Sequence, residues 1–262
     1  MKYILLLFLT VLLWSCSDQK DFNGKLQHKN ISTLSTQKDI LIDNPSLSGK
    51  HPQYEWQKFY ASKNPYITKE FFRCHGNSKN PIIKTESEED IKDCNGFRNH
   101  SLPLSGTNEF IYPSLINILN YLQDETGHRV VITCGYRCPQ HNKYADPSSY
   151  NNTSKHMIGA EADFYIEGLE DHPEEVIDLI LNYYRDSKDK KFKRYKKKNT
   201  NVSTYPWYND EIFVKLFKSH EGRDWDNRHQ HPYVSIQIRY DKDEDKSVSY
   251  SWDSAFKNYL RW

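Results

Sequence analysis

The chain has 262 residues, of which 36 are Lys or Arg, 35 are Asp or Glu and 37% are apolar. Because the charges nearly cancel, a general nucleic-acid binder is disfavoured and no nucleic-acid partner is expected. An aromatic content of 14% supplies the material for a hydrophobic core. Together these values exclude a chain that is disordered throughout, a collagen and a polytopic membrane protein.

The first residues have the pattern of an export signal. An apolar run at residues 4–13 follows a short basic start and is too short to cross a bilayer as a helix, which needs about 20 residues. The run ends in the letters LWSC, which resemble a bacterial lipobox. We therefore expect a lipoprotein signal peptide at residues 1–15, a lipid on Cys16 and a flexible polar tether over residues 16–50.

A lipid on Cys16 would anchor the protein to a membrane of the cell envelope. Under the usual Gram-negative sorting rule, Ser17 after that cysteine favours the periplasmic side of the outer membrane over the inner membrane. The lipid would be the contact with the membrane, and we expect the protein to be a monomer.

Four further cysteines are expected to form disulfides, because an even number of cysteines outside the cytoplasm favours pairing. They are Cys74, Cys94, Cys134 and Cys138. Pairs that are local in sequence, Cys74–Cys94 and Cys134–Cys138, are preferred, and free buried thiols are the alternative. Zinc held by four thiolates is disfavoured because paired CxxC motifs are absent.

The regular elements are predicted to begin after an aromatic stretch. Pro113 suits a first helical turn and Gly127 a helix end, and apolar residues at helical spacing lie between them, so a helix is predicted from about Tyr112. The β-branched run at residues 129–133 predicts a strand. Further along the chain we predict a strand at 160–166, a helix at 173–184, and strands at 212–217 and 233–240.

This order of elements predicts an α+β fold with a central antiparallel sheet flanked by helices. We expect one domain over residues 51–262, in which 51–108 form an N-terminal extension packed on the core. Residues 188–198 hold eight Lys or Arg. They favour a solvated loop or strand edge over a patch for anionic glycan or phospholipid.

Residues 133–165 contain the most informative motifs. The letters GYR end at Arg137, and the later segment SKHMIGAEAD places His156 and Asp163 seven positions apart with Gly159 between them. On a helix this spacing is two turns, too far for the two side chains to share one ion. A loop followed by a strand brings both to one point, and an imidazole with a carboxylate suits zinc.

Together, GYR and SxHxxGxxxD resemble the D-alanyl-D-alanine carboxypeptidase family of zinc peptidases, over roughly residues 109–240. The resemblance implies a Zn²⁺ cofactor in a cleft on the sheet, with His156 and Asp163 as ligands. It also implies that Arg137 binds the substrate carboxylate or stabilises the transition state. The family supplies a third histidine ligand three positions after an acidic general base. Asp226 and His229 have that spacing.

Several assignments stay open at this point. His231 competes with His229 as the third ligand, because the strand at 233–239 has no histidine. Glu161 stands where the family motif has alanine, so a carboxylate either points away from the metal or alters the site. His141 is either a residue that orients the site or an exposed histidine at a helix start.

The predicted function is that of an envelope-anchored zinc metallopeptidase. Its substrate would be a peptide bond in peptidoglycan stem peptides or cross-links, and carboxypeptidases, dipeptidases and endopeptidases all share these motifs. The alternative is a non-catalytic peptidoglycan-binding lipoprotein on the same fold, which the two departures from the family pattern favour.

Overall fold

A computed structural model describes residues 64–85, 89–147, 154–185, 187–188, 190–197 and 206–261. The predicted signal peptide, the lipidation site at Cys16 and the tether lie outside these residues. The described residues all belong to one compact unit. Within them, every helix is too short or too polar to cross a membrane.

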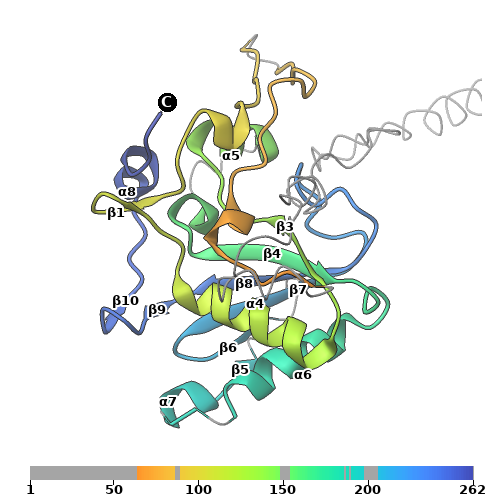
Figure 1. The fold of residues 1–262 in the computed structure, drawn as a ribbon. Helices are drawn as coiled ribbons and strands as arrows, with labels where there is room; N and C mark the ends of the chain where they lie inside the picture. The colour runs from red at the N-terminus through yellow and green to blue at the C-terminus, as the bar shows by residue number, and fades with distance from the viewer. Residues whose placement is uncertain are drawn as a thin grey trace, which may run out of the picture. The chain divides into compact units, whose positions relative to one another are not determined.

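A six-stranded antiparallel sheet is the centre of the fold (Figure 1). Each strand runs antiparallel to its neighbours. The structure therefore confirms the predicted α+β fold, and it confirms the four longer strands within two residues at either end. In spatial order the strands are β3 (Val130–Cys134), β4 (Glu161–Ile166), β8 (Tyr233–Ile238), β7 (Ile212–Phe217), β6 (Trp207–Tyr208) and β5 (Lys196–Lys197).

Two helices lie along one side of this sheet (Figure 1). Helix α4 (Pro113–Thr126) begins with proline and ends at Gly127, whose φ is 63°. Helix α6 (Pro173–Tyr183) also begins with proline, and it contacts both α4 and strands β7 and β8. Both helices were predicted from these boundary residues and from apolar spacing, and both are confirmed.

The long strands present different chemistry on their two faces, because side chains alternate along a strand. One set of positions is apolar and buried, and it faces the helices: Ala162, Phe164, Ile166, Val234, Ile236, Ile238, Ile212, Val214 and Leu216. The other set includes Glu161, Asp163, Ser235, Gln237 and Lys215. The second face of the sheet therefore carries polar side chains on three adjacent strands.

The segment before the sheet joins the same core. Ile67 and Phe72 are fully buried, and the Tyr136 amide donates to the Phe72 carbonyl over 2.7 Å. Gly135 fits here because a Cβ on it would lie 2.6 Å from the Phe72 Cα. The shorter elements are η1 (Lys69–Phe72), η2 (Gly96–Arg98), β1 (Leu104–Ser105), β2 (Asn108–Glu109), α5 (Pro139–Ala145), η3 (Lys155–Ile158), α7 (Lys190–Lys193), β9 (Tyr240–Asp241), β10 (Lys246–Ser247) and α8 (Trp252–Lys257).

The basic run at residues 188–198 forms α7 and the edge strand β5. Phe192 is buried in the core, whereas the basic side chains that the structure describes in this run are exposed. The described part of this run therefore includes a strand edge, as predicted.

The disulfide prediction is wrong for this structure, because the four cysteines are free and buried. Cys74 and Cys94 are neighbours, as predicted, but their sulfurs are 3.8 Å apart. Cys138 lies with these two, whereas the Cys134 sulfur lies 3.3 Å from a nitrogen of His156. Proximity in sequence was misleading because the Cys138 side chain caps the start of α5 and faces the N-terminal segment.

Candidate functional site

His156 is presented by η3, a short turn between a loop and strand β4. The Ser154 side chain caps this turn by accepting from the His156 amide, and Gly159 ends it with a φ of 70°. The His156 Nδ1 lies 2.7 Å from the Gly135 carbonyl oxygen. A carbonyl only accepts, so the proton is on Nδ1 and Nε2 is left as the nitrogen that can bind a metal.

Two carboxylates face that nitrogen. Asp163 Oδ2 lies 3.5 Å from the His156 Nε2, and Glu161 Oε2 lies 3.7 Å from it. All three side chains are buried. Burial opposes a charged imidazole, but the two carboxylates outweigh it and raise the pKa of His156. The structure thus brings together the two residues predicted as metal ligands, and Glu161 points toward them.

The second oxygen of Glu161 is anchored by neighbouring strands. Oε1 accepts from Ser235 Oγ over 2.8 Å and from the Gln237 amide over 2.6 Å, and it lies 3.7 Å from Lys215 Nζ. These contacts leave Oε2 directed at His156. A carboxylate held by one oxygen and presented by the other is typical of a metal ligand with supporting hydrogen bonds.

Cys134 is a third neighbour of the pair. Its sulfur, the imidazole of His156 and a carboxylate oxygen of Asp163 all lie within 4.8 Å of one another. The sulfur is 3.3 Å from Nδ1, the nitrogen that already faces the Gly135 carbonyl. Cys134 therefore lies beside the ring edge that is turned away from the carboxylates.

Arg137 forms the centre of an ionic network next to this pair. Its Nε donates to Asp226 Oδ2 over 2.7 Å and its Nη2 to Asp224 Oδ2 over 2.6 Å. His156 holds the pKa of Asp163 below its usual value against the effect of burial, and the Arg137 guanidinium adds to this lowering. Arg137 thus lies within electrostatic reach of the candidate metal ligands, with two carboxylates already bound to it.

Asp226 receives hydrogen bonds on both oxygens. The second donor is His141, whose Nε2 lies 2.9 Å from Asp226 Oδ1 and whose Nδ1 lies 2.7 Å from Asp93 Oδ1. Burial alone would raise the pKa of Asp226, but Arg137 and His141 hold it well below its usual value. His141 is therefore a buried residue that positions Asp226, not an exposed histidine at a helix start.

His229 lies next to Tyr165, which follows Asp163 on the same face of β4. Its ring is 5.2 Å from that of Tyr165, and His231 lies 5.0 Å from the same tyrosine. Neither ring nitrogen of His229 has a hydrogen-bond partner among the described residues. Burial lowers its pKa to about 4, so the ring is neutral at pH 7. Within the described ranges, its nitrogens do not join those groups of possible ligand atoms that lie within 4.8 Å of one another.

Three residues of the network were not found from the sequence. Asn227 donates to Asp163 Oδ2 over 2.8 Å and accepts from Thr133 Oγ1 over 2.6 Å, so it connects the Asp226 loop to the candidate ligands. Asp224 and Asn227 lie within two positions of Asp226 in the sequence, and this proximity could have identified them as site residues. The sequence offers no such signal for Asp93, because it comes from a distant loop.

A buried imidazole facing two carboxylates on a sheet offers nitrogen and oxygen atoms of the kind that bind metal ions such as zinc. The model of the family described as Peptidase M15 matches residues 87–199. This match includes Arg137, His156 and Asp163, and it confirms the predicted resemblance to the M15 family of D-Ala-D-Ala carboxypeptidase-like zinc peptidases. No curated protein and no solved structure matches the chain. The family supports a metallopeptidase.

Proposed function

We propose that the protein is a zinc metallopeptidase that hydrolyses a peptide bond in peptidoglycan stem peptides or cross-links. The observation that carries the proposal is the Nε2 of His156, which faces Asp163 over 3.5 Å within the region that matches the peptidase family. A buried imidazole with an adjacent carboxylate fits Zn²⁺, which takes nitrogen and oxygen ligands.

His156 and Asp163 would hold the metal, and two residues compete for the third position. Glu161 is favoured because its Oε2 already lies 3.7 Å from the His156 Nε2. His229 is the alternative from the family spacing, and its neutral ring has no hydrogen-bond partner among the described residues. Three protein ligands leave the fourth position of a catalytic zinc free for water.

When bound, zinc polarises the scissile carbonyl and lowers the pKa of water. The remaining steps belong to side chains of the chain. Asp226 is proposed as the base that takes the proton of the attacking water and returns it to the leaving amine. Arg137 is proposed to bind the substrate carboxylate or the developing negative charge, and Asp224 and Asp226 hold its guanidinium in place.

The proposed setting is the cell envelope, with a lipid on Cys16 as the anchor. Peptidoglycan stem peptides end in carboxylates and occur in the same compartment, so location and chemistry agree. A Cys16→Ser variant should stay uncleaved or become soluble, as measured by cell fractionation and intact mass. A variant that still fractionates with membranes at the mature mass would contradict the lipid anchor.

The activity is tested on purified peptidoglycan, with the released fragments identified by mass and the zinc content measured on the same preparation. His156→Ala and Asp163→Ala should lose the zinc of the sheet site, measured as the decrease from the wild-type zinc content, and should also lose hydrolysis. Fragment masses also distinguish a carboxypeptidase, which releases single residues, from an endopeptidase, which separates cross-linked stems.

Asp226→Asn separates a base from a positioning residue. If Asp226 is the base, the variant keeps its zinc and loses hydrolysis by about 10²–10⁴-fold, the typical contribution of general acid–base catalysis. If hydrolysis persists at a high level, Asp226 only fixes Arg137. An Arg137→Lys variant serves as the comparison, because it keeps the positive charge but loses the planar guanidinium that can form two parallel hydrogen bonds.

The third ligand is tested by the zinc held at the sheet site, measured as the decrease in zinc content relative to the wild type. If Glu161 is the ligand, Glu161→Ala weakens zinc binding while His229→Ala and His231→Ala do not. Loss of zinc only in His229→Ala would instead support the family spacing, and loss only in His231→Ala would remove the role given to Asp226.

The second candidate function is a peptidoglycan-binding lipoprotein without turnover. The ion pair between Lys215 and Glu161, at 3.7 Å, favours it, because a lysine neutralises one carboxylate of the site. A wild-type protein that binds peptidoglycan but holds no zinc at His156 under metal-replete conditions would support this function and contradict the peptidase.

A further inference from the structure

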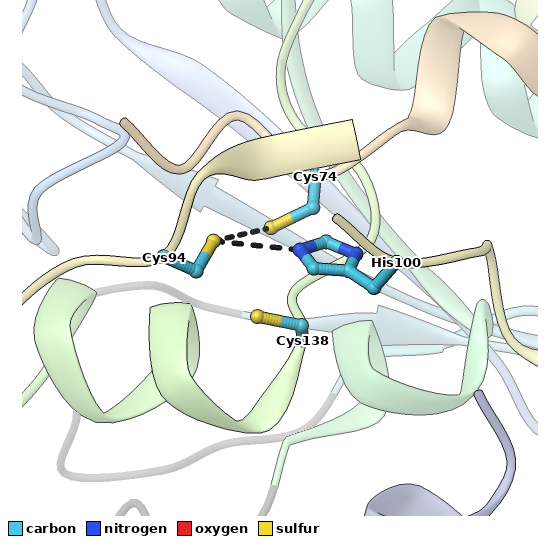
Figure 2. A group of neighbouring side chains, drawn as sticks. All are labelled: Cys74, Cys94, His100 and Cys138. Carbon is cyan, nitrogen blue, oxygen red and sulfur yellow. Dashed lines mark hydrogen bonds between the residues drawn. The ribbon is translucent and has the colours of Figure 1, made fainter. Parts of the chain in front are cut away.

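A second group of possible metal ligands lies away from the sheet face. Cys74, Cys94, Cys138 and His100 are all buried, and one ligand atom from each lies within 4.8 Å of all the others (Figure 2). Figure 2 shows the three sulfurs and the imidazole converging on one point from different segments. Three thiolates and one histidine are one of the common ligand sets of structural zinc sites.

The distances within this group are those of ligands around one ion. The Cys74 and Cys94 sulfurs are 3.8 Å apart, and the Cys94 sulfur is 3.4 Å from His100 Nε2. Two sulfurs at tetrahedral positions about 2.3 Å from a zinc ion lie about 3.8 Å apart, and a sulfur and a nitrogen lie about 3.5 Å apart. A disulfide instead requires sulfurs about 2.05 Å apart.

The surroundings of the group also suit a metal site. The Gly96 amide points at the Cys94 sulfur over 3.2 Å, and the His141 amide points at the Cys138 sulfur over 3.3 Å. Such N–H donors favour thiolates over thiols. The other ring nitrogen of His100 lies 3.4 Å from the Ser101 carbonyl, which leaves Nε2 directed at the cluster.

Two glycines allow the backbone to approach the sulfurs. A Cβ on Gly76 would lie 2.0 Å from the Cys94 sulfur, so only glycine leaves room there. Gly96 has a φ of 66°, and a Cβ on it would lie 2.4 Å from the Gly76 carbonyl oxygen. Cys74 and Cys94 each precede one of these glycines by two positions.

We infer that Cys74, Cys94, Cys138 and His100 bind a structural zinc ion, separate from the site around His156. Disulfide formation would pair two of these sulfurs and leave the third unpaired beside an imidazole, whereas one ion uses all four groups. Binding releases the thiol protons to solvent and requires no oxidant.

The ion would join three parts of the chain that are far apart in sequence. Cys74 follows η1, Cys94 and His100 flank η2, and Cys138 caps the start of α5. Arg137 immediately precedes this cap. The zinc site would therefore hold the N-terminal segment against the start of α5, next to Arg137. This role does not depend on whether the site around His156 is catalytic.

The test uses the full-length chain carrying His156→Ala, purified with zinc present and without chelator, so that zinc of the sheet site is excluded. We expect one zinc per chain, and X-ray absorption should show sulfur ligands at about 2.3 Å. Replacement of zinc by Co²⁺ should give sulfur-to-cobalt charge-transfer absorption in the near ultraviolet. These measurements need no change in the cluster itself.

Substitutions then locate the ion. Cys138→Ser and His100→Ala should weaken or abolish zinc binding and remove or reduce the charge-transfer band. His100→Cys should keep the ion and strengthen the band, because it adds a fourth thiolate. Cys134→Ser is the matched control, since it removes a buried thiol outside the cluster, and it should leave the band unchanged.

Three outcomes would overturn the inference. One is a Cys74–Cys94 disulfide, or any other bridge within the cluster, in peptides mapped without reduction. A second is bound zinc whose absorption spectrum lacks sulfur ligands. The third is a parent protein that contains no zinc after zinc-replete purification and whose cluster thiols all react with an alkylating reagent on unfolding.

Discussion

Among single residues, Arg73 connects the N-terminal segment to the core by its charge. Its guanidinium donates to both oxygens of Glu109, over 2.9 Å and 2.7 Å, and to Glu70 over 2.6 Å. The hydrogen bond from Arg73 holds the pKa of Glu109 below its usual value, although burial opposes this effect. The pair therefore stabilises the folded chain only while Glu109 is ionised.

We predict that Glu109→Gln lowers the free energy of unfolding by about 1 kcal/mol at pH 7. Because the folded pKa is depressed, the full contribution is present above the unfolded pKa, about 4.3, and is lost as pH falls through the folded pKa. Urea unfolding of wild type and variant, repeated at decreasing pH, should show their difference shrinking in acid. Glu89→Gln is the control, because its ion pair with Lys143 is exposed and contributes little. A difference independent of pH would contradict the prediction.

The sequence identified some site residues and not others for physical reasons. His156 and Asp163 lie in one short motif, so their approach depends on a local turn that Gly159 makes possible. Glu161 is two positions from Asp163, and strand alternation alone places both carboxylates on one face. Asp93 reaches the site from a distant loop, so only the tertiary fold brings it there.

Among the elements, α6 stabilises the sheet through one buried face. Ile180 is fully buried, whereas Asp178 is exposed on the same helix. We predict that Ile180→Ala lowers the free energy of unfolding by about 2–5 kcal/mol, because it removes buried methyl groups and leaves a cavity. Asp178→Ala should change it by less than about 0.5 kcal/mol. Chemical denaturation of both variants measures the comparison, and equal effects would contradict the assigned orientation of the helix.

The longer elements were predictable because their signals are local. Proline starts and apolar periodicity fix α4 and α6, and a glycine ends α4. Strands β5 and β6 have two residues each, too few for a pattern of alternation, and they form by pairing, β6 with the edge of β7 and β5 with β6. The cysteine cluster was missed for a related reason: its members pair across the fold and not along the chain.

At the scale of the molecule, the two edges of the sheet are protected differently. The β3 edge lies against η1, whereas the β5 edge carries the exposed Lys196. Charged edge strands resist pairing with a second sheet. This arrangement supports the proposal of a monomer.

We predict that Lys196→Val promotes self-association, because it replaces an exposed charge on the edge strand with a β-branched apolar side chain. Sedimentation velocity over a range of protein concentrations should show larger species for the variant and not for the wild type. Lys190→Val, an exposed change in α7, is the control and should remain monomeric. Association of both variants to the same extent would indicate a general loss of solubility.

Strand β4 belongs to the core and to the candidate site at the same time. Ala162 and Phe164 face the helices, while Glu161 and Asp163 alternate with them on the polar face. Inserting or deleting one residue would exchange the two sets, placing carboxylates in the core and a phenyl ring beside His156. Evolution can therefore vary this strand by substitution, but a change in its length would damage stability and chemistry together.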